Sequence, residues 1–468
     1  MSLTTRQYIL KGAPWAATGR IVYAALGFST SVLLARLLTR SDVGLYFLSI
    51  SLSSFIAIFA RAGMDNVLLR RISGSIGSGR PQEVVAATKC AMRVVTISTL
   101  LCVAGYLVVG PGLTPWLFPV SRLNMVTVPT ALWIGALALQ MTLTEVLRGF
   151  KDIRGAALTG GITNSALFVV LLLVVALAGG RSYLNATVVL WLSLAAAAVN
   201  IVLAAALVLT ASRALPHEAV STLSARKLLS EAWPLMLDSV VLFGLANIGL
   251  WVVGAMLSAE QVAIYGMALR LVTLVSMPTQ IANSVLPPLM SQLYVQGRLR
   301  ELENIVRKTT TLIALPMLLV LLPLVLYGGT ILAALFGPAY REGGAVIGYL
   351  ALAQAAMVVA GSSGFLLIMT SHQRAAAAIS TSAAVAYLPL AIMAAKPYGA
   401  AGAAFAFLCV MTVTKIAQVI VARVRVGIWT QFDVTSLNRS SLKRLVRKAV
   451  ERRSPVHDDR ASDGARYG

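Results

Sequence analysis

The stretch VLLARLLTRSDVGLYFLSISLSSFIAIFARAGMDNVLLRR, residues 32–71, shows the pattern that determines the fold. It contains two apolar runs separated by a short polar turn, and two arginines follow the second run. With its apolar neighbours, each run reaches about 20 residues, which is the length of an α-helix that spans a lipid bilayer. The stretch therefore predicts two membrane-spanning helices joined by a tight hairpin.

The composition of the whole chain indicates a protein that is surrounded mostly by lipid. Of its 468 residues, 58% are hydrophobic and only 12% are charged, against about 25% charged residues in a soluble domain. The mean hydropathy is +0.82. So few charges could not cover the exterior of soluble domains. This excludes a cytosolic enzyme, a disulfide-stabilised secreted scaffold and a disordered chain.

Apolar stretches of spanning length recur along the chain, and they predict an all-α polytopic membrane protein with twelve transmembrane helices. The first stretch is too long, and carries too many arginines, to be a cleaved signal peptide, so we expect it to be retained. The predicted spans are residues 14–37, 43–63, 86–110, 124–147, 156–178, 186–210, 232–257, 262–286, 309–335, 345–369, 375–395 and 399–422.

The formal net charge of +22 suggests nucleic-acid binding at first sight, but the positions of the basic residues favour another explanation. If the N-terminus is cytoplasmic, 28 of the 39 lysines and arginines fall in cytoplasmic segments and only 5 in outside loops. Cytoplasmic loops of membrane proteins are enriched in Lys and Arg, so both termini are predicted to be cytoplasmic. We interpret the excess charge as contact with anionic lipids of the inner leaflet, and no nucleic-acid partner is expected.

The end of the chain, residues 425–468, is a basic cytoplasmic tail in this topology. Within 437–453, leucines and valines recur near helical spacing and basic residues flank them. This pattern predicts an amphipathic helix that lies on the inner leaflet.

A weak internal repeat divides the chain into two halves. Residues 38–46, LTRSDVGLY, align with residues 257–265, LSAEQVAIY, and each segment joins the first two spans of a six-span half. We predict an N-terminal six-helix bundle at 1–210, a cytoplasmic connector at 211–230 and a C-terminal six-helix bundle at 231–424. Two halves with the same orientation enclose a path between them, which favours a transporter with alternating access.

Eight charged residues remain inside the predicted spans, where a charge costs about 3 kcal/mol or more unless it faces a cavity or a partner. They are Arg20, Arg36, Arg61, Arg93, Arg270, Lys415, Glu145 and Asp238. For four of them, snorkelling to an interface is an equally good explanation; these are Arg36, Arg61, Arg93 and Lys415. Glu145 can form an ion pair with Arg148, three residues further along the helix.

Arg20, Asp238 and Arg270 are harder to explain by snorkelling, because they lie in spans that should line the path between the halves. Asp238 falls almost opposite Arg20 under the repeat alignment. An ion pair between them is one arrangement that could hold one face of the transporter closed. The alternative, in which both residues contact unrelated polar groups and serve only structure, remains open.

The surplus of cations inside the spans favours an anionic substrate. Arginine binds phosphate through two parallel hydrogen bonds, whereas an exporter of cationic drugs needs acidic and aromatic groups. We therefore expect an amphipathic substrate that carries a phosphate or diphosphate on a lipid.

We expect neither enzymatic activity nor a cofactor. The sequence has no phosphate-binding loop for ATP and no metal-ligand spacing. Asp238 and Glu145 are the candidate carboxylates for coupling to H⁺ or Na⁺, or for gating.

Residues 32–71 also resemble the opening of the polysaccharide flippases, the Wzx-like branch of the multidrug/oligosaccharidyl-lipid/polysaccharide (MOP) exporter superfamily. The resemblance rests on Ala35-Arg36-Leu37-Leu38 at the end of a span, Gly44-Leu45-Tyr46 after the turn and Gly63-Met64 at the exit. Leu147-Arg148-Gly149 resembles a further family segment, and the twelve spans extend the resemblance to about residue 425.

This resemblance implies a V-shaped pair of six-helix bundles in a bacterial inner membrane. It implies flipping of undecaprenyl-diphosphate-linked oligosaccharide for the synthesis of exopolysaccharide, capsule or the O-antigen of lipopolysaccharide, by a monomer, with polymerase or export machinery as candidate partners. By similarity to lipid II flippases, Arg20, Arg61 and Arg270 would bind the diphosphate.

Other functions remain open at this point. A lipid II flippase is less favoured, because that branch usually has fourteen spans. An ion-coupled small-molecule exporter of the multidrug (MATE) type is the second hypothesis. A scaffold, glycosyltransferase or polymerase is the third, and the short, nearly uncharged outside loop at 111–123 disfavours the enzymes.

Overall fold

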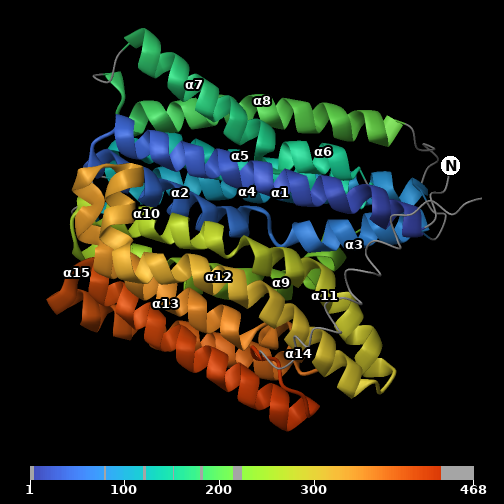
Figure 1. Ribbon diagram of the computed structural model, residues 1–468. Helices are drawn as coiled ribbons and strands as arrows, with labels where there is room; N and C mark the ends of the chain where they lie inside the picture. The colour runs from blue at the N-terminus through green and yellow to red at the C-terminus, as the bar shows by residue number, and fades with distance from the viewer. Residues whose placement is uncertain are drawn as a thin grey trace, which may run out of the picture.

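The computed structural model describes residues 5–77, 81–119, 123–150, 152–179, 183–213 and 224–433. These residues form long helices joined by short turns, and strands are absent from them (Figure 1). The predicted all-α class is confirmed. The predicted amphipathic helix at 437–453 lies outside the described residues, as does half of the predicted connector, residues 214–223.

The helices are numbered along the chain. They are α1 (Thr5–Leu37), α2 (Arg40–Ala60), α3 (Met64–Gly77), α4 (Pro81–Leu117), η1 (Leu123–Val126), α5 (Thr127–Gly149), α6 (Ile153–Ala157), η2 (Leu158–Ile162), α7 (Thr163–Gly179), α8 (Ala186–Arg213), α9 (Ala225–Met256), α10 (Ala259–Val275), α11 (Met277–Val295), α12 (Leu299–Phe336), η4 (Pro338–Gly343), α13 (Gly344–Ala360), α14 (Ser363–Met369) and α15 (Gln373–Val426).

Each of the twelve predicted spans lies largely in helix. Among the described residues, ten helical segments are long and apolar enough to cross a membrane, and the α10–α11 pair, bent by 53°, adds one more if it is counted as one span. The 54-residue α15 contains two predicted spans, because its backbone leaves helical geometry at Gly399. The Tyr387 hydroxyl lies 3.5 Å from the Ala403 carbonyl oxygen, whereas 16 residues of straight helix would span about 24 Å. The chain therefore reverses direction within α15.

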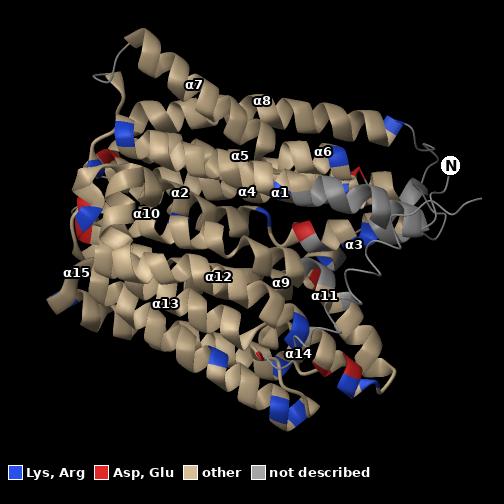
Figure 2. Ribbon diagram, in the orientation of Figure 1, with Lys and Arg blue, Asp and Glu red and all other residues tan. Residues whose placement is uncertain are grey.

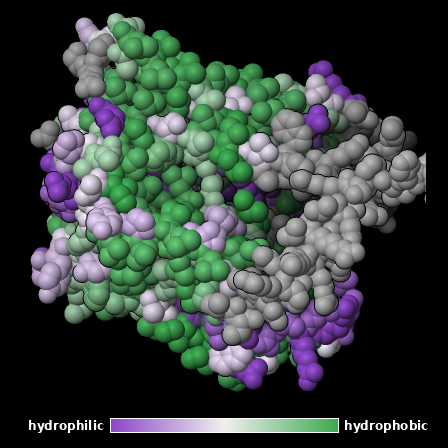
Figure 3. All heavy atoms as spheres, viewed as in Figure 1, coloured by the Kyte–Doolittle hydropathy of each residue, from purple (hydrophilic) through white to green (hydrophobic). Residues whose placement is uncertain are grey.

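The distribution of side chains agrees with a lipid environment. Most charged residues gather at the two ends of the helices (Figure 2), and hydrophobic residues form a broad band between them (Figure 3). Helical backbone satisfies its own hydrogen bonds, as lipid requires. At helix starts, side chains complete this pairing. Thr39 Oγ1 accepts from the Asp42 amide at 3.2 Å, and Asp152 Oδ1 accepts from the Gly155 amide at 2.9 Å.

We refer to residues 5–213 as the N-terminal half and to residues 224–433 as the C-terminal half (Figure 1). The two repeat segments meet where α2 packs against α10. Beside them, at what we call the hairpin end, Arg36 donates to the carbonyl oxygens of Ala334 and Leu335 at 2.7 and 3.1 Å. Arg40 forms an ion pair with Glu342. These contacts join the halves at the end opposite the N-terminus.

The halves also touch at mid-height and near the N-terminus. Trp251 Nε1 donates to Ser51 Oγ at 2.9 Å between α9 and α2. At what we call the N-terminal end, Glu231 of α9 pairs with Arg70 and Arg71 of α3, at 3.0 and 2.5 Å. Cross-half contacts therefore run from the hairpin end to the N-terminal end, through α1 and α12 as well as α2, α3, α9 and α10.

The segment that follows α15, residues 427–433, folds back onto the C-terminal half and covers a break between α13 and α14. Thr430 Oγ1 donates to the Ala360 carbonyl at 2.9 Å, and the Phe432 amide donates to the Val359 carbonyl at 2.8 Å. Asp433 pairs with Arg307 of α12 at 3.1 Å. The segment thus satisfies carbonyl groups that the end of α13 leaves without helical partners.

Replacing Thr430 with valine is expected to destabilise the C-terminal half. Valine has nearly the same shape but cannot donate, so the buried Ala360 carbonyl loses its partner, at a cost of about 1–3 kcal/mol. Thermal unfolding of the detergent-purified protein measures the effect as a lower Tm. Thr430→Ser retains the hydroxyl and is the control; equal Tm values for the valine and serine variants would contradict the role given to this hydrogen bond.

Candidate functional site

A cavity with two connected chambers lies between the halves, lined by α1, α5 and α7 of the N-terminal half and by α10 and α11 of the C-terminal half. The first, which we call the cationic chamber, has a volume of about 680 Å³. The second, the neutral chamber, has a volume of about 400 Å³. The two share lining residues, which are Tyr23, Gly160, Met277 and Gln280. Both volumes are in the range of small-molecule binding sites.

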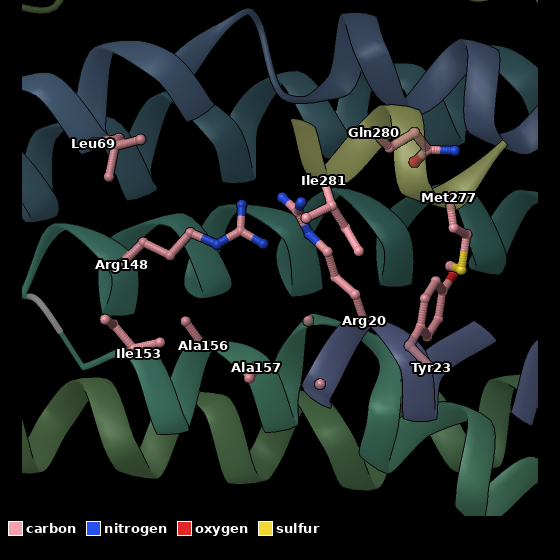
Figure 4. Close-up of a pocket in the computed structure, with 12 residues that line it drawn as sticks. Arg20, Tyr23, Leu69, Arg148, Ile153, Ala156, Ala157, Met277, Gln280 and Ile281 are labelled. Carbon is pink, nitrogen blue, oxygen red and sulfur yellow. The ribbon is translucent and has the colours of Figure 1, made fainter. Parts of the chain in front are cut away.

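Two arginines define the cationic chamber. Arg20 comes from α1 and Arg148 from the last turn of α5, and their guanidinium groups turn toward one another across the chamber (Figure 4). Arg148 also pairs with Glu145 at 2.5 Å. Among the described residues that line this chamber, aspartate and glutamate are absent. Two like charges that converge in this way repel, so the chamber suits an anion placed between them.

The turn after α5 and the start of the next span shape the wall between the chambers. Asp152 caps α6, and the helix then widens into the π-helical segment η2, where Gly161 has φ 140°. A side chain at Gly161 would collide with the ring of Tyr23. Glycine therefore lets α1 approach η2 closely, and Tyr23, which lines both chambers, marks their junction.

The neutral chamber extends from that junction toward the hairpin end. Arg270 of α10 is the one charged residue among its described lining residues. The remainder is aromatic, aliphatic or neutral polar, and includes Tyr46, Trp133, Gln140 and Asn164. The cavity as a whole is therefore cationic, with its charge concentrated toward the N-terminal end.

A family model described as "Polysaccharide biosynthesis protein" matches residues 9–294, which is more than half of the chain. The chain belongs to the polysaccharide biosynthesis protein family. This match confirms the resemblance drawn from residues 32–71. A search of curated protein sequences finds no match.

Solved structures of MOP superfamily transporters share the fold of this polysaccharide biosynthesis protein. An inward-facing multidrug resistance MATE family transporter has a TM-score of 0.67 and 14% identity, covering 88% of this chain and 98% of that one. The lipid II flippase MurJ, in an inward closed conformation, has a TM-score of 0.67 and 12% identity, covering 95% and 93%. The MATE multidrug transporter DinF-BH, in complex with R6G, has 0.65 and 17%, covering 90% and 96%.

These matches establish a multi-pass membrane protein with a transporter fold. The family and its structural neighbours support a flippase or transporter, and at such low identity the neighbours describe the fold alone. Among the residues that the structure describes, no group of three or more His, Cys, Asp or Glu side chains is arranged to hold a metal ion.

Of the three arginines predicted to bind a diphosphate, the structure places two at the cavity. Arg20 lines the cationic chamber and Arg270 the neutral chamber. Arg61 lines neither; it ends α2 and forms an ion pair with Asp65 of α3. Burial raises the pKa of the Asp65 carboxyl above its usual value, and the charge of Arg61 partly opposes this shift.

The other charged residues singled out in the spans also lie outside the chamber linings. Arg36 holds α12 at the hairpin end, Arg93 is exposed on α4, and Lys415 of α15 donates to Gln418 at 2.9 Å. Asp238 is exposed on α9 and does not lie with Arg20 in the cationic chamber. The contact between Glu145 and Arg148 confirms the predicted pair three residues apart.

Sequence reasoning missed the role of Arg148 in the cavity. Arg148 was interpreted as the partner of Glu145 and as part of the family segment Leu147-Arg148-Gly149, and not as a cavity residue. One observation could have revealed it: Arg148 ends its span beside the polar and glycine-rich segment that opens the next one, Asp152 to Asn164. Such irregular backbone near membrane depth is tolerated where it lines a cavity.

Proposed function

We propose that this protein flips undecaprenyl-diphosphate-linked oligosaccharide units across the bacterial inner membrane by alternating access. The polymer made from these units would be an exopolysaccharide, a capsule or the O-antigen of lipopolysaccharide. The observation that carries the proposal is the pair of guanidinium groups, Arg20 and Arg148, that converge in a cavity between two halves. The family to which the chain belongs supports the same conclusion.

The chemistry of the cationic chamber suits a diphosphate. Each guanidinium offers a planar fork of donors that matches two phosphate oxygens, so Arg20 and Arg148 would hold the diphosphate between them. Arg270, further along the cavity, adds positive potential without a carboxylate in the described lining. The lipid chain, which is apolar, would remain in the bilayer.

Alternating access requires that contacts at one end open as those at the other end close. At the hairpin end, Arg36, Arg40 and Glu342 hold α1 and α2 against α12 and η4. With both termini in the cytoplasm, the cationic chamber is nearer the cytoplasmic side, where a lipid-linked substrate would enter. The closed hairpin end would then be the exit.

The membrane potential favours this direction of transport. The cytoplasm is negative, so moving an anion outward releases about 2.3 kcal/mol per charge at 100 mV. Coupling to H⁺ or Na⁺ through Asp238 or Glu145 would add to this driving force. Anionic inner-leaflet lipids would contact the basic tail, and the polymerase or export machinery would take up the flipped product from a monomeric flippase.

Deleting the gene tests this function. Surface polysaccharide is expected to disappear and lipid-linked repeat units to accumulate in the inner membrane, and the wild-type gene is expected to restore both. The fold is also that of MATE multidrug transporters, so a cation exporter is the second candidate. Unchanged polysaccharide together with increased sensitivity to cationic drugs would reject the flippase and favour the exporter.

A further inference from the structure

The neutral chamber differs in chemistry from the cationic chamber beside it. The described residues lining it include several hydroxyl and amide side chains: Thr30, Ser54, Gln140, Asn164, Ser165, Ser193, Thr273 and Gln280. Within the same described lining, only Arg270 is charged. Such a surface offers neutral hydrogen-bonding groups, which fit a neutral, hydroxyl-rich group better than a second charged group.

Three polar side chains in this wall each have one buried atom without a hydrogen-bond partner. Gln140 donates its amide to the Thr159 carbonyl at 3.3 Å, and this leaves Oε1 without a donor. Trp133 Nε1 lacks an acceptor and Asn164 Oδ1 lacks a donor. Gln140 and Trp133 are each only 6% exposed. Buried polar atoms without partners are costly, and a ligand with hydroxyl groups that enters the chamber would supply them.

Aromatic side chains stand beside these polar groups. Tyr23, at the junction of the two chambers, is 44% exposed although it lies in the middle of the protein. Tyr46 and Phe168 stack with ring centroids 6.4 Å apart in the same lining. An aromatic face packs against apolar C–H groups, while amides and hydroxyls pair with O–H groups. A sugar ring presents both kinds of surface.

We infer that the neutral chamber is a saccharide subsite that binds the sugar next to the diphosphate. This inference rests on the proposed function. The diphosphate lies between Arg20 and Arg148, and the adjoining sugar passes Tyr23 into the neutral chamber, where Gln140, Asn164 and Trp133 contact its hydroxyl groups. These three residues are then specificity-determining residues, because they distinguish a lipid diphosphate that carries a sugar from one that does not.

The test uses the full-length protein in lipid nanodiscs and two probes. One probe is undecaprenyl diphosphate alone. The other is the lipid-linked oligosaccharide extracted from host cells that lack this gene. The variants Gln140→Met and Asn164→Leu preserve side-chain volume and remove hydrogen-bonding groups. Gln354→Met is the matched control, since Gln354 is a buried glutamine in α13 that lines neither chamber.

Wild-type protein is expected to bind the sugar-bearing probe at least about tenfold more tightly than the bare diphosphate. A site built to hydrogen-bond a hydroxyl discriminates strongly against a ligand that lacks it. Gln140→Met and Asn164→Leu are expected to lose most of this preference while their affinity for the bare diphosphate stays unchanged. Arg20→Gln is expected to weaken binding of both probes.

The outcomes separate the two proposals. If Gln140→Met and Asn164→Leu both keep the wild-type preference for the sugar-bearing probe, the saccharide subsite is overturned and the flippase proposal stands. An equal loss in Gln354→Met, or an equal loss for both probes in the chamber variants, would also overturn it, because the effect would then be structural. Failure of wild-type protein to bind either probe would reject the proposed function itself.

Discussion

Polysaccharide export by the double variant Arg20→Gln, Arg148→Gln is expected to fall by about two to four orders of magnitude. A hydrogen bond to a charged group contributes about 1.5–3 kcal/mol, and each 1.4 kcal/mol corresponds to about a factor of ten. The variant removes both guanidinium groups that line the cationic chamber. Surface polysaccharide per cell, measured at equal amounts of the protein in the membrane, gives the result.

Single variants distinguish the chamber from a general effect of lost charge. Arg20→Gln leaves the pair of Glu145 and Arg148 intact, so it separates the contribution of Arg20 from that of the pair. Arg20→Lys is expected to be intermediate, because an ammonium group keeps the charge but lacks the planar fork. Arg93→Gln is the control, since Arg93 is exposed on α4 and lines neither chamber. If the double variant exports as well as the control, the chamber does not bind the substrate.

Replacing Gly44 with alanine is expected to open the hairpin end and stop transport. In α2, the added methyl group would overlap the carbonyl oxygen of Ala259 at the start of α10. Backbone cannot move aside as a flexible side chain can, and such overpacking costs about 1–3 kcal/mol. Because the clash exists only while the halves meet at this end, it shifts the conformational equilibrium by about 5- to 150-fold toward the state open there.

Thiol labelling from outside the cell measures that shift. In a background without the three native cysteines, Ser193→Cys places one thiol in the neutral chamber. Gly44→Ala is expected to increase its labelling by an impermeant reagent. Gly105→Ala in α4 is the control, because a methyl group there meets nothing within 4 Å. Unchanged labelling with normal export in Gly44→Ala would show that α2 and α10 separate little during transport.

The helices could be predicted from the sequence because lipid imposes one strong requirement. A segment without polar partners must satisfy its own backbone, so length and apolarity suffice to locate it. The breaks within spans were harder to predict from the sequence. The reversal at Gly399 was predicted, because it falls where the predicted spans 375–395 and 399–422 meet, but the gap at Gly361 lies inside the predicted span 345–369 and is covered by residues that lie far along the chain. Such a gap depends on contacts that local composition does not encode.

For the site, sequence reasoning located charged residues in spans but could not determine which way they face. Arg20 and Arg61 look alike in sequence, each an arginine beside small residues in a span. In the structure, Arg20 lines the cavity, whereas Arg61 forms an ion pair with Asp65, four residues further on. Arg148 shows the opposite error. Its ion pair with Glu145 already explained its charge, so its position opposite Arg20 in the cationic chamber was not predicted. The direction in which each side chain points depends on how the two halves pack.

The segment at 427–433 has a consequence for how the protein is made. A chain released from the ribosome after residue 426 would already contain all the spans found among the described residues, yet the carbonyl groups of Val359 and Ala360 would lack the partners that Thr430 and Phe432 provide. Domains fold as units while synthesis proceeds, so the packing of the C-terminal half is completed only when residues 427–433 have been made. A premature stop just past the final span would yield an inserted protein whose unfinished core quality-control proteases can recognise.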